Sequence, residues 1–448
     1  MAAGLHGSDL SVIWVIPFIC MLLSIAIFPL VAGEFWHHHF GKIAAGWGMA
    51  FLIPCAIVFG LGTAFEQFAH AMVDEYIPFI ILLFSLFTVA GGIRLKGSLV
   101  GTPVVNTGIL LIGTILASWM GTTGAAMLLI RPLLRANAHR KYRVHSVVFF
   151  IFLVANIGGS LTPLGDPPLF LGFLKGVEFF WTLEHLLVPM AFVAAVLLCL
   201  YFTIDTCLFN KEGKPVPPDS GEGPLMLEGK VNFLLLGGVI CSVLMSGMWN
   251  PGIEIPVFGH VHYQLQNLSR DILLLVIAAI SWKVTRQESR KANGFNWFPI
   301  IEVAKLFFGI FISMIPAIAI LRAGTDGALA SVINLVSTAD GQPINTMYFW
   351  LTGALSSFLD NAPTYLVFFN TAGGEASAMM GPLAHTLMAI SAGAVFMGAN
   401  TYIGNAPNFM VRSIAEDQGV PMPSFFGYML WSVGILIPTF ILFTILFI

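Results

Sequence analysis

The sequence predicts an all-α polytopic membrane protein, and its composition carries this prediction. Of its 448 residues, 57% are hydrophobic and only 10% are charged, whereas roughly 25% of the residues in soluble domains are charged. The mean hydropathy is +0.87, and the apolar residues fall into runs long enough to cross a bilayer as helices. With a net charge of −3 and no nucleic-acid-binding motif, the expected partner is the lipid bilayer and no nucleic acid.

Ten apolar runs are candidate membrane spans, and the run at 271–282 is short for a full crossing. The runs lie near 11–32, 43–64, 76–92, 145–172, 188–209, 231–249, 271–282, 298–322, 381–411 and 424–448. Two further apolar stretches are interrupted midway by small and polar residues, and these are 102–137 and 343–372.

Loops rich in Lys and Arg set the expected orientation, because such loops stay on the cytoplasmic side. They are "RLKGS" at 94–98, "RANAHRKYR" at 135–143, "KVTRQESRK" at 283–291 and the linker 210–230. Loops 66–76 and 250–269 contain neither Lys nor Arg, so we expect them outside. Counting spans from these loops places both termini outside, in a multi-pass protein of the bacterial inner membrane. Lys175 and Arg322 then remain as isolated basic residues on the outer side.

The two interrupted stretches are predicted to be re-entrant hairpins. The stretch 102–137 has basic residues at both ends, so both ends are expected in the cytoplasm and the tip at "SWMGTTG" inside the membrane. The stretch 343–372 is flanked by Asp340 and Glu375 and has no Lys or Arg close to either end. It is expected to enter from outside, with its tip at "SFLDNAP", 357–363.

An internal repeat relates the two halves of the chain. "TPLGDPP" from Thr162 aligns with "TYIGNAP" from Thr401, and the same shift of 239 residues places Ser118 over Ser357 at the two hairpin tips. Each half holds five spans and one hairpin, and an odd number of spans inverts the second half. This pattern is typical of inverted-topology repeats in secondary transporters. The predicted units are a first repeat 1–209, a cytoplasmic linker 210–230 and a second repeat 231–448.

Two spans are expected to be broken within the membrane. The stretch "NIGGSLTPLGDPPLF" places three glycines, three prolines and an aspartate within one span, and these residues disfavour a continuous helix. Irregular backbone at membrane depth is tolerated only where it is buried or lines a cavity. We expect the helix 145–172 to be broken around 160–167 and, by the repeat, the helix 381–411 around 401–406. The glycines expected to need unusual conformations or close approaches are Gly159, Gly165 and Gly404.

Two carboxylates mark the candidate site, Asp166 at the first break and Asp360 at the second hairpin tip. A carboxylate inside a bilayer is costly and is a functional candidate by default. Neutral oxygen donors of the kind that complete the shell of a hard cation surround both in the sequence. These donors are Asn361, Asn156, Thr162, Thr122, Thr123, Asn400, Thr401 and Asn405. The competing interpretation is that such residues cap the broken helix ends and satisfy freed backbone groups.

Three long motifs carry a resemblance that covers nearly the whole chain. "GTTGAAMLLIRPLLRAN", "NIGGSLTPLGDPPLFLGFL" and "SSFLDNAPTYLVFFNTAGG" resemble the NhaD-type sodium/proton antiporters of the ion transporter superfamily, whose relatives are often labelled citrate transporters. The superfamily also holds arsenite-pump subunits and sodium-coupled dicarboxylate symporters. The resemblance implies inverted repeats, two re-entrant hairpins, two broken helices, a homodimer and an elevator-like movement. It places the functional regions at 118–124, 156–168, 357–364 and 400–408.

One departure distinguishes this chain from the dicarboxylate symporters of that superfamily. Their hairpin tips resemble Ser-Asn-Thr, whereas this chain has Gly-Thr-Thr at 121–123 and Asp-Asn-Ala at 360–362. The departure argues against dicarboxylate binding at the tips.

The leading functional hypothesis is exchange of Na⁺ or Li⁺ for H⁺, with Asp166 and Asp360 as shared sites for Na⁺ and the proton. Na⁺ would be the transported ion, and no cofactor is expected. The sequence lacks a phosphate-binding G-x-x-x-x-G-K-[ST] loop and the H-E-x-x-H and G-x-S-x-G motifs, so we expect a secondary transporter and not an enzyme. The alternative is sodium-coupled symport of a carboxylate such as citrate or a dicarboxylate, which would favour amides, Arg or Lys at the midplane.

Overall fold

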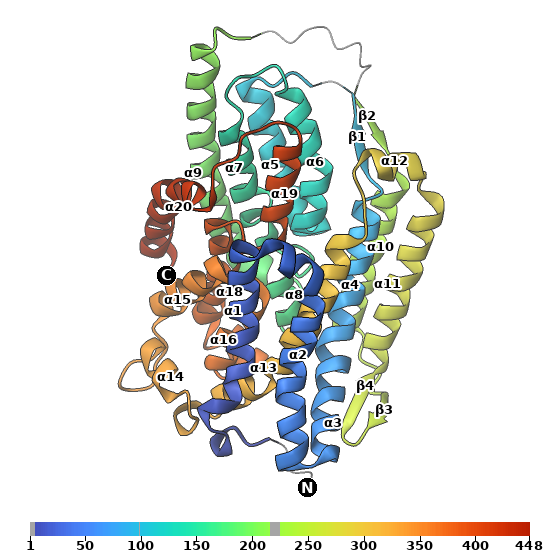
Figure 1. Cartoon of the computed structure of the whole chain (residues 1–448), viewed down its shortest axis with the longest axis vertical. Coiled ribbons are helices and arrows are strands. Elements are labelled where there is room, and N and C mark those ends of the chain that lie inside the picture. The colour runs from blue at the N-terminus through green and yellow to red at the C-terminus, as the bar shows by residue number, and fades with distance from the viewer. Residues whose placement is uncertain (1–4, 98, 216–224) are drawn as a thin grey trace.

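The chain folds into a bundle of long apolar helices (Figure 1). The structure is a computed structural model that describes residues 5–97, 99–215 and 225–448. Within these residues, nine helices are long and apolar enough to cross a membrane. They span Val12–Val31, Gly33–Phe59, Leu61–Ala90, Pro103–Met120, Trp181–Lys211, Val231–Met248, Leu265–Val284, Phe298–Arg322 and Phe425–Phe447. The predicted class of an all-α polytopic membrane protein is confirmed.

The first three crossings form the start of the bundle. Their elements are η1 (Gly7–Asp9), η2 (Val12–Val15), α1 (Ile16–Val31), α2 (Gly33–Phe59), α3 (Leu61–His70), the π-helical turn η3 (Ala71–Tyr76) and α4 (Ile77–Ala90). The prediction of a loop at 66–76 is wrong, because α3, η3 and α4 form one helical span. The acidic residues there are compatible with a helix because Glu75, the buried one, is paired with Lys175.

The stretch 102–137 forms a helical hairpin made of α5 (Pro103–Met120) and α6 (Thr122–Ala136). The chain reverses at Gly121, whose φ of 81° suits glycine. At the open end of the hairpin, the amides of Asn106 and Asn137 donate to each other's oxygens at 2.9 and 2.8 Å. Thus α5 is long enough to be a span, but the chain reverses after it and α6 returns toward the end where α5 began.

The fourth predicted span is broken, and the break is longer than predicted. It consists of α7 (Val144–Leu153), the short turn η4 (Ile157–Ser160) and α8 (Pro167–Leu174). The helix ends at Leu153, well before the predicted break at 160–167. Gly158 lies inside the break, where a Cβ would lie 2.5 Å from the carbonyl oxygen of Thr114 on α5, so the break packs closely against the first hairpin.

Two small antiparallel sheets depart from a purely helical chain. After α9 (Trp181–Lys211), the strand β2 (Met226–Glu228) pairs with β1 (Arg94–Lys96), so the predicted linker 210–230 is partly ordered against the loop that follows α4. Residues 216–224 of this linker lie outside the described residues. The second sheet pairs β3 (Glu254–Phe258) with β4 (Val261–Gln264).

The second half repeats the order of long helices, a hairpin and a broken helix. Its elements are α10 (Val231–Met248), α11 (Leu265–Val284), α12 (Gln287–Ala292), α13 (Phe298–Arg322), η5 (Gly324–Asp326), α14 (Ala330–Val336), the hairpin α15 (Asn345–Phe358) and α16 (Asn361–Thr371), α17 (Ala376–Met380), α18 (Ala384–Met397), η6 (Gly398–Asn400), α19 (Ala406–Asp417) and α20 (Phe425–Phe447). The break between α18 and α19 covers 398–405, close to the predicted 401–406.

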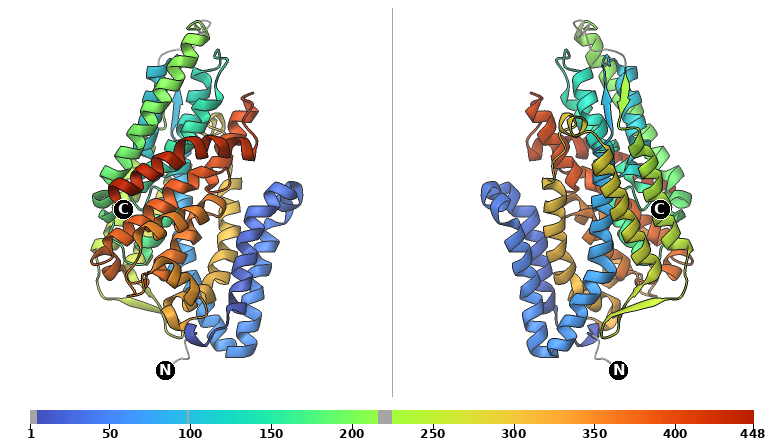
Figure 2. Two further views of the ribbon diagram at one scale, coloured as in Figure 1. Left: turned by 90° about the vertical axis from the view of Figure 1, so that its left-hand side faces the viewer. Right: turned by 90° about the vertical axis from the view of Figure 1, so that its right-hand side faces the viewer.

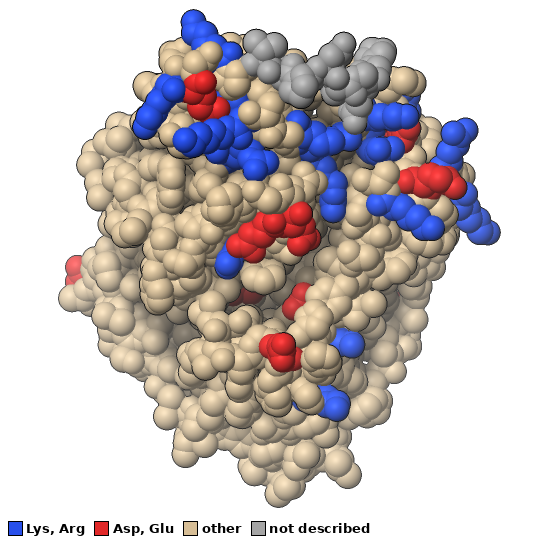
Figure 3. Space-filling view, turned by 45° about the horizontal axis from the view of Figure 1, so that its top comes forward, with Lys and Arg blue, Asp and Glu red and all other residues tan. Residues whose placement is uncertain are grey.

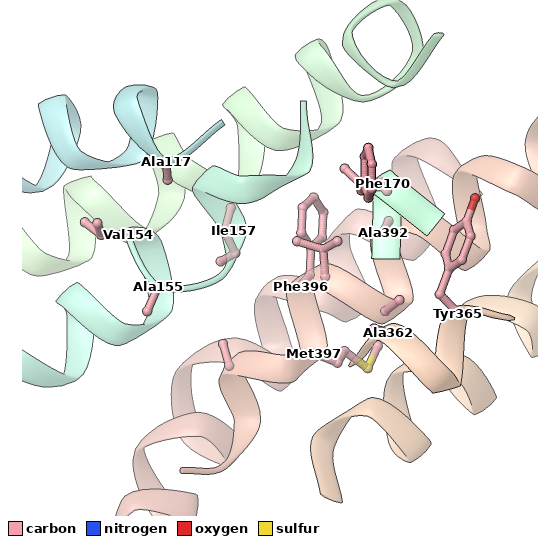
Figure 4. Close-up of a cluster of buried hydrophobic side chains, with 14 of the residues drawn as sticks. Ala117, Val154, Ala155, Ile157, Phe170, Ala362, Tyr365, Ala392, Phe396 and Met397 are labelled. Carbon is pink, nitrogen blue, oxygen red and sulfur yellow. The ribbon is translucent and has the colours of Figure 1, made fainter. Parts of the chain in front are cut away.

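The hairpins and the broken helices occupy the interior of the bundle. All residues of α7 except Val144, and nearly all of α18, are buried, whereas α1 and α2 lie at one side of the molecule (Figure 2). Figure 4 shows apolar side chains of both halves packed around the breaks, among them Ile157, Phe170, Phe396 and Tyr365. Burial on this scale keeps the irregular backbone out of contact with lipid, as membrane structures require.

Basic side chains gather at one end of the molecule (Figure 3). This end, which we call the basic end, is formed by the end of α9, the β1–β2 sheet and α12. Its exposed basic residues include Lys96, Lys141, Lys211, Lys230, Arg286 and Lys291. The N-terminal residues, α3 and the β3–β4 sheet lie at the opposite end (Figure 1).

Candidate cation site

Four segments that are far apart in the sequence meet at the side chain of Asp166. Its Oδ1 accepts hydrogen bonds from Oγ1 of Thr122 at 3.1 Å and from Nδ2 of Asn405 at 3.1 Å. Its Oδ2 accepts a hydrogen bond from Nδ2 of Asn361. Thr122 and Asn361 begin the second arms of the two hairpins, while Asp166 and Asn405 immediately precede α8 and α19. Both hairpin tips and both helix breaks therefore converge on one carboxylate.

The carboxylate of Asp166 is buried without a cationic partner. The residue is 2% exposed, its three side-chain partners are neutral, and none of the ion pairs among the described residues includes it. It occupies the N-cap position of α8, yet its side chain forms no capping hydrogen bond. An isolated buried charge is strongly disfavoured. The site therefore favours a carboxyl group that carries either a proton or a bound cation.

Asp360 has a different environment, and the structure does not bring it into hydrogen-bond contact with Asp166. Its Oδ1 accepts a hydrogen bond from the backbone N–H of Ala362 at 3.0 Å, which caps the N-terminus of α16. Its side chain lies at a partly exposed position. The capping interpretation of the sequence therefore describes Asp360 well, because a short acidic side chain is a favourable N-cap.

Two buried amide oxygens close to the hairpin tips and breaks have no hydrogen-bond donor among the described residues. They are Oδ1 of Asn361 and Oδ1 of Asn400. Asn361 uses its Nδ2 on Asp166, and Asn400 uses its Nδ2 on Oγ of Ser357 at 2.9 Å. Buried acceptors are normally satisfied, and amide oxygens are suitable ligands for a hard cation. Of the two, the free oxygen of Asn361 belongs to a side chain that contacts the uncompensated carboxylate of Asp166.

A chain of buried amides connects the two breaks. Nδ2 of Asn405 lies 3.3 Å from Oδ1 of Asn156, and Nδ2 of Asn156 donates to Oδ1 of Asn408 at 2.7 Å. Asn408 in turn donates to the carbonyl oxygens of Gly398 and Thr401, both at 2.9 Å. Sequence reasoning did not single out Asn408, although the predicted functional region 400–408 includes it and its position three residues after Asn405 at the start of a helix was a usable signal.

Thr162 and Thr401 tie the breaks to the hairpin tips. The hydroxyl of Thr162 donates to the carbonyl oxygen of Ser118, and that of Thr401 donates to the carbonyl oxygen of Ser357 at 2.5 Å. Each hydroxyl also accepts a backbone N–H two residues later at 3.2 Å. These two threonines therefore satisfy backbone groups freed by the breaks. Their oxygens are engaged locally, as the capping interpretation expects.

The three predicted glycines lie where the backbone is closely packed. A Cβ on Gly165 would lie 2.2 Å from the carbonyl oxygen of Gly159, and a Cβ on Gly404 would lie 2.5 Å from that of Gly398. A Cβ on Gly159 would meet the methyl group of Thr122 at 2.6 Å. The glycines are thus needed for close approach. Thr123 is partly exposed and is not among the side chains bonded to Asp166.

A second buried aspartate, Asp205 on α9, was not predicted. Its Oδ1 accepts from Nη2 of Arg140 at 2.7 Å and lies 2.9 Å from Nε2 of His145, and its Oδ2 accepts from Nδ2 of Asn106 at 3.0 Å. Arg140 also lies 3.4 Å from Glu212. This cluster joins the open end of the first hairpin to α9. The only sequence signal was an Asp near the end of an apolar run, which usually indicates a solvated helix end.

The known proteins to which this chain is similar are transporters. An uncharacterized transporter of Mycobacterium bovis and one of Mycobacterium tuberculosis are each 25% identical to this chain over 332 residues, which cover 72% of this chain and 72% of each relative. A family model described as "Putative citrate transport" matches residues 7–448. This match spans the hairpins, the breaks and almost all of the helical bundle. The chain therefore belongs to the transporter family described as "Putative citrate transport".

Proposed function

We propose that this transporter exchanges Na⁺ (or Li⁺) for H⁺, with Asp166 as the shared binding site. The observation that carries the proposal is a carboxylate that is 2% exposed, has only neutral hydrogen-bond partners and lies where both hairpin tips and both breaks meet. Broken helices at such positions commonly form ion sites in secondary transporters.

The exchange follows from competition for one carboxyl group. When Asp166 carries a proton, the charge is removed and no cation is held. When the proton leaves, the charge requires a counter-ion, and the amide oxygen of Asn361 is close enough in the same cluster to contribute. Because proton and cation cannot both neutralise the same carboxylate, the two fluxes are coupled without a second pathway. Closure of the hairpin tips around the site would prevent an uncoupled leak.

The second candidate is sodium-coupled uptake of a carboxylate, and the description of the family favours it. The bonds around Asp166 argue against it at this position, because a substrate carboxylate would face another carboxylate. The tips also offer no Arg or Lys, since residues 118–124 and 357–363 contain neither. Antiport therefore accounts better for the side chains of the cluster.

We also propose that the two halves form an inverted repeat, with the basic end in the cytoplasm of a bacterial inner membrane. Contacts that recur 239 residues later support the repeat, such as Thr162 to Ser118 and Thr401 to Ser357. A cysteine near residue 140 or 288 should then be labelled only from the cytoplasm, and one near residue 255 only from outside. Labelling of residues 97 and 140 from opposite sides would contradict the re-entrant arrangement of the first hairpin.

The decisive experiment is a flux assay on the full chain in proteoliposomes. An imposed Na⁺ gradient should move protons in the opposite direction, measured with an internal pH dye, when no organic anion is present. Citrate should not be needed and should not be taken up with Na⁺. Na⁺-dependent uptake of radiolabelled citrate without Na⁺-driven proton movement would replace antiport with symport.

A further inference from the structure

A cavity with charged residues in a largely apolar lining lies away from the Asp166 cluster, near the end of the molecule opposite the basic end. It has a volume of about 510 Å³ and is lined by the N-terminal residues around Gly7, by α3 and η3, by the end of α8 and by the last turns of α13. Its charged lining residues are Glu75, Lys175 and Arg322. This volume is in the range of small-molecule sites.

The cavity brings together the two basic residues that the sequence left isolated on the predicted outer side. Lys175 forms an ion pair with Glu75, and the side chains of the two residues are 15% and 10% exposed. Arg322 belongs to none of the ion pairs among the described residues. Asp326, an acidic residue four positions later in the chain, is exposed and does not pair with it. Two cations and one anion thus line the cavity itself, and Asp74, just outside the lining, lies 3.2 Å from the lining residue His70.

The guanidinium of Arg322 is held in place by a neutral group. Its Nε donates to Oδ1 of Asn370 at 2.7 Å, and Asn370 is fully buried near the end of α16. Its Nη1 and Nη2 have no acceptor among the described residues. A guanidinium fixed through Nε presents its remaining N–H groups as a fork, and this geometry suits a carboxylate.

We propose that this cavity binds a small anion that carries a carboxylate group, between Arg322 and Lys175. The anion would accept hydrogen bonds from Nη1 and Nη2 of Arg322 and would compete with Glu75 for Lys175. The site is separate from the Asp166 cluster: Lys175 follows Asp166 by nine residues across α8, or about 13 Å at 1.5 Å per helical residue. The proposal does not depend on which ions the protein transports.

Lys175 and Arg322 also lie where helices end, and cations stabilise helix C-termini. This simpler role makes a different prediction about Glu75. If the pair only stabilises the fold, loss of either partner is harmful in the same direction. If the cavity binds an anion, loss of the lysine weakens binding, whereas loss of the glutamate removes a competitor and strengthens it.

The test is titration calorimetry of the purified full chain in detergent without Na⁺ and at low ionic strength. The probes are citrate, succinate, acetate, phosphate and chloride. The wild-type protein should bind at least one carboxylate more tightly than it binds phosphate or chloride. Equal or tighter binding of phosphate or chloride overturns the carboxylate assignment, and no binding of any carboxylate at millimolar concentration overturns the site.

Variants locate the site within the protein. Arg322→Gln and Lys175→Gln should each weaken carboxylate binding roughly ten- to a hundred-fold, because each removes charge-assisted hydrogen bonds. Glu75→Gln should tighten binding, and Arg322→Lys should restore part of the affinity. The exposed control changes Lys42→Gln and Arg286→Gln should have no effect. Unchanged binding in Arg322→Gln, which alters an exposed side chain and leaves the Glu75–Lys175 pair intact, contradicts the proposal.

Discussion

Asp166 and Asp205 are two aspartates of one protein with the same burial and opposite surroundings. Asp205 is fully buried and lies 2.7 Å from Arg140 and 2.9 Å from His145. Asp166 is 2% exposed and has only a hydroxyl and two amides as side-chain partners. The fold supplies Asp205 with a cationic partner and supplies Asp166 with none among the described residues.

The backbone around the two residues also differs, because it is a continuous helix at Asp205 and is interrupted at Asp166. Asp205 lies inside the 31-residue helix α9, where its partners come from the ordered open end of the first hairpin. Asp166 lies at a junction where two hairpin tips and two helix breaks meet. Burial alone therefore does not identify an ion site in a membrane protein. The informative combination is burial, missing counter-charge and interrupted backbone.

The strongest test of this contrast is Asp166→Asn. The amide has the shape of the carboxylate but cannot exchange a proton, so Na⁺-driven proton flux should fall to the background of empty proteoliposomes. The protein should remain folded, because a buried charge is removed and the unpartnered Oδ1 of Asn361 can accept from the new amide after a flip of its side chain.

The matched control for this change is Asp340→Asn at an exposed position, which should keep full flux. Undiminished antiport in purified Asp166→Asn would transfer the proton-carrying role to another residue and remove the main reason for the proposed mechanism.

The second test alters the backbone that places Asp166. Gly165→Val would put a side chain 2.2 Å from the carbonyl oxygen of Gly159, where no flexible group can move aside. We expect loss of flux and a lower melting temperature in detergent. The control is Gly108→Val on α5, because an added Cβ there meets nothing within 4 Å. Wild-type flux and stability in Gly165→Val would show that the break tolerates a different backbone path.

The sequence predicted the helix breaks and Asp166, but it did not predict the buried pair of Arg140 with Asp205. Glycines and prolines within an apolar run predicted the first break, since few other structures accommodate them in a membrane, and the internal repeat predicted the second. Asp166 was identifiable because it adjoins such a break. The pairing of Arg140 with Asp205 was not, because it depends on how the end of α9 packs against the loop between α6 and α7, 65 residues away in sequence. The helix at 66–76 was missed because its acidic residues resemble a loop until Lys175 supplies a counter-charge.

The third test removes the carboxylate of Asp205 that pairs with Arg140. Asp205→Asn leaves the buried Arg140 with the carbonyl oxygen of Gly101 at 3.1 Å and the more distant carboxylate of Glu212 at 3.4 Å, and breaking a buried pair costs roughly 3–5 kcal/mol. We expect a clear fall in the melting temperature in detergent, together with near-normal flux per folded molecule. The opposite pattern, a stable protein without flux, would make Asp205 part of the transport pathway and weaken the contrast with Asp166.

The smallest effect is expected at Asp360, the other aspartate next to the cluster. Its carboxylate accepts one backbone N–H at the start of α16 and is partly exposed. Asn is about as good an N-cap as Asp, so Asp360→Asn should lower stability by only a few tenths of a kcal/mol, whereas Asp360→Ala should cost about 1 kcal/mol. Thermal unfolding of both variants beside the wild-type protein measures the difference. Flux should fall less than ten-fold in Asp360→Asn, measured as for Asp166→Asn. Complete loss of flux in a stable Asp360→Asn protein would instead make this carboxylate a second ion site, and antiport would then require both aspartates.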